Sequence, residues 1–180
     1  MKPQLLLHVC CGPCATEALR RLAGEYAVIG CFANPNIAPE EEFLRRAAAA
    51  EQLAAAWHVP FEVLPCDHGA FLSAVRGLEA EPEGGRRCDI CYRLRLGAAA
   101  ERALAYGCTH LATTLTVGPR KPALAINPIG HDVCRKRGLE FVAGDWKKQD
   151  GFRRSVARAR ELGLYRQHYC GCEFSLPPEE

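Results

Sequence analysis

Short apolar runs alternate with longer amphipathic segments along most of the chain. The apolar runs are brief and nearly uninterrupted, as in strands that are buried on both faces of a parallel sheet. They lie at residues 4–9, 26–33, 61–64, 110–116 and 140–143. The segments with helical spacing lie at residues 15–22, 40–57, 71–78, 90–106, 123–137 and 151–162. The pattern also predicts an interruption of the fifth helix near Pro128, a turn at residues 81–85, and a tail from residue 165 to 178 without a clear period.

Strands that alternate with helices predict an α/β fold with a parallel sheet of about five strands, flanked by helices. The chain has 180 residues, of which 48% are hydrophobic and 24% charged, which suits a single domain over residues 1–180. Ligands bind such sheets at the carboxyl ends of the strands. The apolar run Leu5 to Leu7 is too short for a signal peptide or a membrane span, so we expect a cytoplasmic protein without a membrane partner.

Eleven cysteines are many for a chain of this length. Without a secretion signal, a disulfide scaffold is disfavoured, and metal or redox chemistry in a reducing cytosol is the better interpretation. Seven cysteines fall in three close-spaced groups, namely Cys10, Cys11 and Cys14, then Cys88 and Cys91, then Cys170 and Cys172. The other four, which we interpret as small core residues, are Cys31, Cys66, Cys108 and Cys134.

The grouped spacing is typical of metal ligands, because a tight turn brings both sulfurs of a C-x-x-C pair to one side of the backbone. The first two groups also lie beside predicted helix N-termini, which favour thiolate charge. A zinc ion or a 4Fe-4S cluster takes about four cysteines, so seven exceed either requirement. The surplus indicates a second metal, a redox-active thiol pair, or a point where substrate meets the metal.

Two other interpretations stay open at this stage. Cys11-Gly12-Pro13-Cys14 has the four residues of a thioredoxin active site, so a disulfide-forming thiol oxidoreductase would need no metal. Thioredoxin-like folds, however, place this motif after a complete βαβ unit, whereas only about ten residues precede it here. The second alternative is a zinc-stapled RNA-binding module, in which the cysteines only stabilise the fold.

Basic residues gather toward the end of the chain. The net charge is only +2, yet residues 135–160 contain nine lysines and arginines against three acids. Such an excess is typical of a surface for phosphate groups, although a solvated helix face looks much the same. The residues that we expect to contact a nucleic-acid backbone are Lys147, Lys148, Arg153 and Arg154.

The cysteine groups and their neighbours resemble the motifs of one known family. The segment Leu5-Leu6-Leu7-His8-Val9-Cys10-Cys11-Gly12-Pro13-Cys14 is similar to the opening motif of QueH-type epoxyqueuosine reductases. Later blocks agree in order, at Asn34-Pro35-Asn36-Ile37, Arg87 to Leu96, Thr113-Thr114-Leu115-Thr116, Gly163 to Gln167 and Tyr169-Cys170-Gly171-Cys172. Because the blocks run from residue 5 to 175, their joint spacing is far more specific than any single cysteine pair.

The resemblance implies a Rossmann-like fold related to adenine-nucleotide hydrolases, with a cysteine-rich metal site at the carboxyl edge of the sheet. It also implies the last step of queuosine synthesis, in which the epoxide of epoxyqueuosine at the tRNA wobble base is reduced to an alkene. Cobalamin is not part of this route, and no nucleotide cofactor is expected, because nothing in the chain resembles a phosphate-binding glycine loop. The expected partners are a tRNA carrying epoxyqueuosine and an unidentified electron donor.

The resemblance further implies a 4Fe-4S cluster as electron source, and we add an adjacent mononuclear iron as Lewis acid for the epoxide oxygen. Catalytic roles are predicted for Cys10, Cys11 and Cys14, cluster binding for Cys10, Cys11, Cys88, Cys91, Cys170 and Cys172, and metal binding for all seven grouped cysteines. Which four hold the cluster stays open. The predicted substrate contacts are Asn34, Asn36, Tyr92, Thr114, Tyr165, Arg166 and Gln167.

Structural roles also stay open for part of this set. The two asparagines belong to a proline-flanked turn, and the tyrosines suit packing around a buried cluster. His8 offers a proton donor near the first cysteines, but a histidine inside a strand is more often a core residue.

Overall fold

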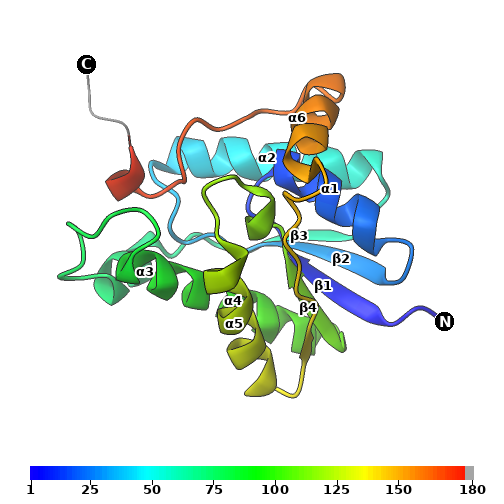
Figure 1. Ribbon diagram of the computed structural model, residues 1–180, viewed down its shortest axis with the longest axis horizontal. Coiled ribbons are helices and arrows are strands. Elements are labelled where there is room, and N and C mark those ends of the chain that lie inside the picture. The colour runs from blue at the N-terminus through cyan, green and yellow to red at the C-terminus, as the bar shows by residue number, and fades with distance from the viewer. Residues whose placement is uncertain (177–180) are drawn as a thin grey trace.

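A parallel sheet of five strands forms the centre of the computed structural model, which describes residues 1–176 (Figure 1). The strands are β1 (Gln4–His8), β2 (Ala27–Phe32), β3 (Phe61–Val63), β4 (His110–Thr113) and β5 (Glu140–Phe141). Their order across the sheet is β3-β2-β1-β4-β5, and every neighbouring pair is parallel. The predicted α/β fold with five parallel strands is confirmed.

Helices cover both faces of the sheet (Figure 1). One layer contains α1 (Gly12–Leu22), α2 (Glu40–Ala56) and α6 (Gly151–Glu161), and the other contains α4 (Arg86–Ala105) and α5 (Ala123–Arg135). The short α3 (His68–Ala74) precedes α4. Two 3-10 turns, η1 (Leu115–Val117) and η2 (Glu173–Ser175), follow β4 and the last cysteine pair.

The central strand β1 has side chains buried on both faces. Leu5 and Leu7 pack into the layer of α1, α2 and α6, whereas Leu6 packs into the layer of α4 and α5. All three side chains are completely buried. A strand covered on both sides has no polar face, which is why the sequence shows an uninterrupted apolar run instead of alternation.

The chain changes direction across the sheet at β1. It proceeds through β2 to β3 on one side and then crosses to β4 and β5 on the other. Open α/β sheets bind ligands at such a switch point, outside the carboxyl ends of the strands. Cys10, Asn34 and Thr114 follow the ends of β1, β2 and β4, so three predicted site residues meet at this edge.

Three helices begin earlier than the sequence predicts, and two of them, α1 and α4, carry cysteines near their start. α1 starts at Gly12 because the Cys11 sulfur caps it, accepting a hydrogen bond from the Cys14 amide at 3.4 Å. α4 starts at Arg86, so Cys88 lies in its first turn and Cys91 follows within the same helix. Both cysteine groups therefore lie at helix N-termini, where the backbone favours thiolate charge.

The predicted interruption near Pro128 is wrong, because α5 runs through this residue. A proline leaves the carbonyl four residues earlier without a helical partner. Here that residue is Leu124, which lies in the first turn of the helix and is 93% exposed. Burial of Ile126, Ile129 and Val133 against the sheet supports the continuous helix.

Several boundaries shift by a few residues. β4 ends at Thr113 and β5 at Phe141, earlier than the apolar runs predict, and α3 begins at His68. The tail is irregular up to η2, and residues 177 and 178 of the predicted tail lie outside the described residues. No helix within residues 1–176 is both long and apolar enough to cross a membrane.

Candidate functional site

The first cysteine group forms a compact set of thiols after β1. The sulfurs of Cys10, Cys11 and Cys14 all lie within 4.8 Å of one another. Thr114, which directly follows the neighbouring strand β4, fixes Cys10, since its hydroxyl accepts a hydrogen bond from the Cys10 amide at 2.9 Å and donates one to the Cys10 sulfur at 3.1 Å. Three sulfurs at this separation suit a metal ion or one face of a cluster.

Negative charge in this group is concentrated on Cys10. Hydrogen bonds from Cys11 and Cys14 hold the pKa of Cys10 well below its usual value, and Arg95 and Thr114 act in the same direction. The contact with Cys10 raises the pKa of Cys11 to about 12 and also raises that of Cys14. The surroundings therefore favour the thiolate form at Cys10 more than at Cys11 or Cys14.

The other two cysteine groups lie together at the start of α4. Cys91 and Cys172 belong to one buried apolar cluster, although they are far apart in the sequence. Burial raises the pKa of Cys91 to about 12, a shift that Arg95 opposes and that nearby Cys170 and Cys172 reinforce. The Cys88 sulfur accepts a hydrogen bond from a backbone amide at 3.2 Å.

A buried arginine of α2 holds the last cysteine loop. Arg46 donates hydrogen bonds to the carbonyl oxygens of Cys170 at 2.9 Å and Tyr169 at 3.1 Å, and Glu42 pairs with it at 2.6 Å. Gly171 has φ of +136°, a conformation that favours glycine, so the middle of this C-x-C pair is suited to no larger residue. Arg46 therefore fixes a loop that has little regular structure of its own.

Thiols from the first and last groups line one inner cavity of about 60 Å³. Cys10, Cys14 and Cys170 contribute sulfurs to its wall, beside Arg95 and Lys121. The structure thus brings distant cysteine groups to the switch point, as the pattern predicts. All eleven cysteines are free thiols, and of the isolated ones Cys31, Cys108 and Cys134 are buried whereas Cys66 is half-buried.

One buried cation, Arg95, and one largely buried cation, Lys121, face these sulfurs, and sequence reasoning did not select them. The Lys121 amine lies 2.8 Å from the Cys170 sulfur and 3.0 Å from Glu83, with 12% of its side chain exposed. Arg95 is 2% exposed, lies 4.0 Å from the Cys91 sulfur, and donates to the Asn34 side-chain oxygen at 2.7 and 3.0 Å. Buried cations are costly unless anions accompany them, so this site is built to hold negative charge.

A thiolate-bound iron-sulfur cluster fits these surroundings. Its thiolate ligands carry the negative charge that Arg95 and Lys121 would balance. The Tyr92 hydroxyl and both amide atoms of Asn36 are buried without a hydrogen-bond partner among the described residues. The Lys121 amine, which contacts the Cys170 sulfur, lies 5.9 Å from the centre of the Tyr92 ring, so these unpaired polar groups include one near the sulfurs. The cysteine ligands, the cations beside them and the polar groups without partners all agree with a bound metal centre of negative charge.

A wider outer pocket of about 270 Å³ opens onto this centre. Cys14 and Cys170 belong to both the outer pocket and the inner cavity. Arg166 and Gln167, two of the predicted substrate contacts, line the outer pocket. The pocket thus connects the protein surface to the sulfurs.

Three other predicted substrate residues, Asn34, Thr114 and Tyr165, form hydrogen bonds within the protein. The Asn34 amide donates to the Val9 carbonyl at 2.9 Å, and its oxygen accepts from Arg95. The Tyr165 hydroxyl donates to Glu42 at 2.7 Å and so supports the Arg46 contact. His8 is fully buried between Thr113 and Asn34, and burial lowers its pKa to about 4, which agrees with a neutral core residue.

The basic segment does not form a single surface. The basic residues 135–137 lie at the end of α5, on the opposite side of the sheet from α6 (Figure 1). The Lys147 amine forms an ion pair with Asp145 at 2.6 Å and donates a hydrogen bond to the Lys121 carbonyl at 2.9 Å. Lys148 is 75% exposed at its side chain, and Arg153 is exposed with no ion pair among the described residues. The candidate phosphate surface is therefore confined to the region of α6.

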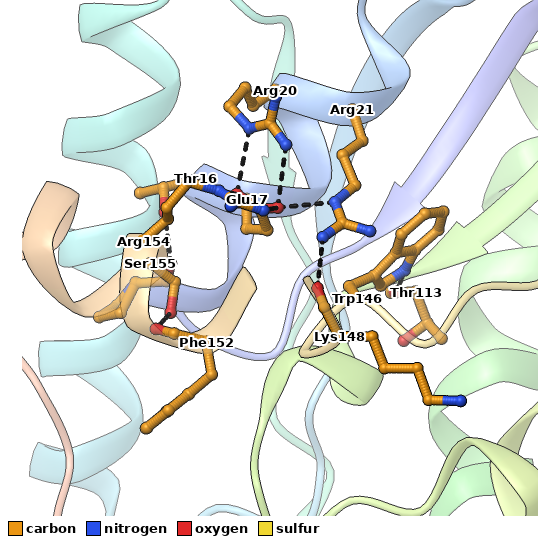
Figure 2. Close-up of polar contacts among 11 residues, drawn as sticks. Thr16, Glu17, Arg20, Arg21, Thr113, Trp146, Lys148, Phe152, Arg154 and Ser155 are labelled. Carbon is orange, nitrogen blue, oxygen red and sulfur yellow. Dashed lines mark hydrogen bonds and ion pairs between the residues drawn. The ribbon is translucent and has the colours of Figure 1, made fainter. Parts of the chain in front are cut away.

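A buried glutamate joins α6 to the helix of the first cysteines. Figure 2 shows Glu17 of α1 between three arginines, with Arg20 and Arg21 at 3.1 and 2.6 Å and Arg154 of α6 at 2.7 Å. Burial alone would raise the pKa of the Glu17 carboxyl, but the hydrogen bonds from Arg154, Arg20 and Arg21 outweigh it and lower the pKa to about 2. Arg154 thus anchors α6.

We expect Glu17→Gln to lower the free energy of unfolding of the reduced apoprotein by about 2 kcal/mol at pH 7, after allowance for the partly exposed arginines. Because the folded pKa is depressed, this contribution is present above the ordinary glutamate pKa and is lost as pH falls toward 2. Urea unfolding of both proteins between pH 7 and pH 3 measures it. The control is Glu161→Gln, which removes an exposed ion pair on α6. Equal losses of unfolding free energy in both variants would contradict the prediction.

The fold and the site together define a class, that of open Rossmann-like α/β proteins whose switch point carries a group of metal-competent thiols. A family model described as "Epoxyqueuosine reductase QueH" matches residues 5–177. The chain belongs to this family.

Curated relatives with the same description extend over nearly the whole chain. The protein of Streptococcus pyogenes is 38% identical over 97% of this chain and 71% of its own length, and that of Staphylococcus epidermidis is 38% identical over 97% and 76%. The Thermotoga maritima protein is 33% identical over 96% of this chain and 90% of its own. The family resemblance noted in the sequence is confirmed.

A solved structure shares the fold at low sequence identity. The U34-tRNA thiolase NcsA from Methanococcus maripaludis, solved with its [4Fe-4S] cluster, has a TM-score of 0.58 and 16% identity. The match covers 98% of this chain but only 63% of the thiolase, so this chain spans less than two thirds of that protein. The likeness supports the Rossmann-like architecture.

Proposed function

We propose that the chain reduces the epoxide of epoxyqueuosine at the tRNA wobble base to the alkene of queuosine, the last step of queuosine synthesis. The observation that carries the proposal is the convergence of cysteines from distant segments of a QueH-family chain on one cavity. The reaction consumes two electrons and two protons and releases the oxygen as water. Side chains do not supply such electrons, so a redox centre and an external donor, not yet identified, are required.

The seven grouped cysteines are the proposed metal ligands. We infer that they act as a set of three, Cys10, Cys11 and Cys14, and a set of four, Cys88, Cys91, Cys170 and Cys172, a division supported by the closeness of the first three sulfurs and by the shared apolar cluster of Cys91 and Cys172. One set would hold a 4Fe-4S cluster and the other an additional mononuclear iron. When bound, these groups supply low-potential electrons and a Lewis acid for the epoxide oxygen. Neither cobalamin nor a nucleotide has a part in the proposal.

The other residues of the site position these groups and the substrate. Thr114 holds the Cys10 sulfur, and Asn34 orients Arg95. Tyr165 acts through Glu42 on the arginine that holds the last cysteine loop. The proposed direct substrate contacts are Arg166 and Gln167 in the outer pocket and Asn36 and Tyr92, whose polar atoms lack partners among residues 1–176.

The first experiment is anaerobic purification with iron, zinc and sulfide analysis and a visible spectrum. Incubation with epoxyqueuosine-containing tRNA and dithionite follows, without cobalamin or nucleotide, and nucleosides are then measured by mass spectrometry. We expect a brown protein with more than about four irons per chain that forms queuosine. A colourless zinc protein, inactive after iron-sulfur reconstitution, would favour the zinc-stapled RNA-binding module, and activity without any metal would favour thiol-disulfide exchange.

We expect tRNA, the proposed cytoplasmic partner, to contact the exposed cations near α6. Lys148→Ala and Arg153→Ala should each reduce the slope of log affinity against log salt by about one. Fluorescence anisotropy with labelled tRNA over a range of salt concentrations measures the slope. Arg135→Ala, on the opposite side of the sheet, is the control and should leave the slope unchanged; unchanged slopes in all three variants would refute this surface.

A further inference from the structure

An exposed aromatic side chain stands at the mouth of the outer pocket. Phe152, the second residue of α6, is 38% exposed and lines the pocket beside Pro13 and Pro119. Within residues 1–176, the other aromatic residue in the exposed class is Tyr106, whose ring is covered by Arg102 at 5.4 Å. The Phe152 ring has no aromatic or cationic neighbour of this kind among the described residues, so its surface is open to a ligand.

The backbone beneath this ring is held firmly. Gly151 is packed so closely that an added Cβ would lie 1.7 Å from the Trp146 carbonyl oxygen, so a side chain cannot be accommodated there. The Phe152 carbonyl accepts a hydrogen bond from the Ser155 hydroxyl at 2.7 Å. Figure 2 shows the Phe152 side chain directed away from these contacts and from the Arg154–Glu17 pair. The backbone that carries the ring is therefore fixed, which limits the freedom that is lost when a ligand binds.

Cations and cysteines line the same pocket as this ring. Arg120, with 82% of its side chain exposed, and Arg166 line the same pocket, and Glu83 is its one acidic residue among those described. Cys14 and Cys170 line the part that is shared with the inner cavity. A planar apolar face with positive charge beside it suits a nucleotide, whose base stacks and whose phosphates are negative.

We propose that the outer pocket is the subsite of the modified nucleotide, in which Phe152 stacks on the base that carries the epoxide and Arg120 and Arg166 contact the flanking phosphates. The inference rests on the proposed function and deepens it by naming the side chain that holds the base. With the base against Phe152, its epoxide-bearing arm extends toward the cavity lined by Cys14 and Cys170.

The test uses the iron-loaded enzyme and an anticodon stem-loop that carries epoxyqueuosine. Because base–aromatic stacking contributes strongly to binding of unpaired bases, Phe152→Ala should raise both KM and Kd by about tenfold or more. The turnover number should change by less than about twofold, and iron content and the visible spectrum should be unchanged, since Phe152 lies outside the sulfur groups. Phe152→Trp should restore KM and Kd, whereas Phe152→Leu, which keeps apolar bulk without a ring, should not.

Leu124→Ala removes another exposed apolar side chain, from α5 on the opposite side of the sheet, and should change neither constant. Unchanged KM and Kd in Phe152→Ala, or full recovery by leucine, would overturn the stacking assignment. If the wild-type enzyme fails to reduce the epoxide, the proposed function fails, and the stem-loop Kd values still decide the subsite. A Kd that depends on an aromatic ring at position 152 supports it, and a Kd indifferent to the ring refutes it.

Discussion

Replacement of Cys14 by alanine is expected to abolish epoxide reduction and to remove one of the two metal centres. Its sulfur lies within 4.8 Å of those of Cys10 and Cys11 and lines both the inner cavity and the outer pocket. Loss of one sulfur leaves two ligands, too few for a stable thiolate site. Iron should fall by about four per chain if this set holds the cluster and by about one if it holds the single iron.

Cys134→Ala provides a matched control, because Cys134 is also buried but lies on α5 and belongs to none of the three cysteine groups. It should keep full iron content and activity, at a small cost in packing. Iron analysis of Cys172→Ala shows in the same way whether the second set holds the cluster or the single iron. Full activity in Cys14→Ala would remove the first set from the mechanism, and dependence of activity on only four of the seven cysteines would refute the two-centre proposal.

Replacement of Arg95 by methionine is expected to lower the free energy of unfolding of the reduced apoprotein by about 3 kcal/mol, because it breaks a buried charged contact. The Asn34 oxygen loses two donated hydrogen bonds, and the sulfurs of Cys10 and Cys91 lose their nearby cation. The same change should reduce iron retention after reconstitution, because a buried negative centre would lack its counter-charge. Urea unfolding and iron analysis measure the two effects.

Arg95→Lys separates charge from geometry, because lysine keeps the cation but cannot donate two hydrogen bonds from one planar group. It should recover iron retention more fully than stability. Arg93→Met, two residues earlier on α4, removes a half-exposed arginine paired with Asp132 and should change stability by less than about 1 kcal/mol. Comparable losses of unfolding free energy in Arg93→Met and Arg95→Met would contradict the prediction that burial beside the sulfurs makes the contribution of Arg95 large.

Fold class and element order could be predicted from the sequence because they depend on local patterns. The apolar run of β1 and the alternation of strands with helices identified a parallel sheet, and the spacing of the cysteines identified a metal site. Boundaries were less accurate, because they depend on contacts of single groups. The Cys11 sulfur extends α1 to Gly12, and core packing carries α5 through Pro128.

The site illustrates the same division. The thiols could be selected because C-x-x-C spacing has few other uses, whereas Arg95 and Lys121 looked like ordinary basic residues of a helix and a loop. Only their burial beside Cys91 and Cys170 distinguishes them. Phe152 could not be selected from the sequence either, because an isolated phenylalanine predicts core packing. Its exposure depends on how α6 lies against α1.

The sequence by itself therefore determined the parallel α/β sheet, the edge of the sheet at which the first cysteine group lies, and the family to which the chain belongs. The tertiary structure decided which distant groups meet. It placed the last cysteine loop on Arg46 and divided the basic segment between opposite sides of the sheet. The physical reason is that periodicity and short-range spacing report local backbone geometry, whereas contacts between remote segments depend on how whole helices pack on the sheet.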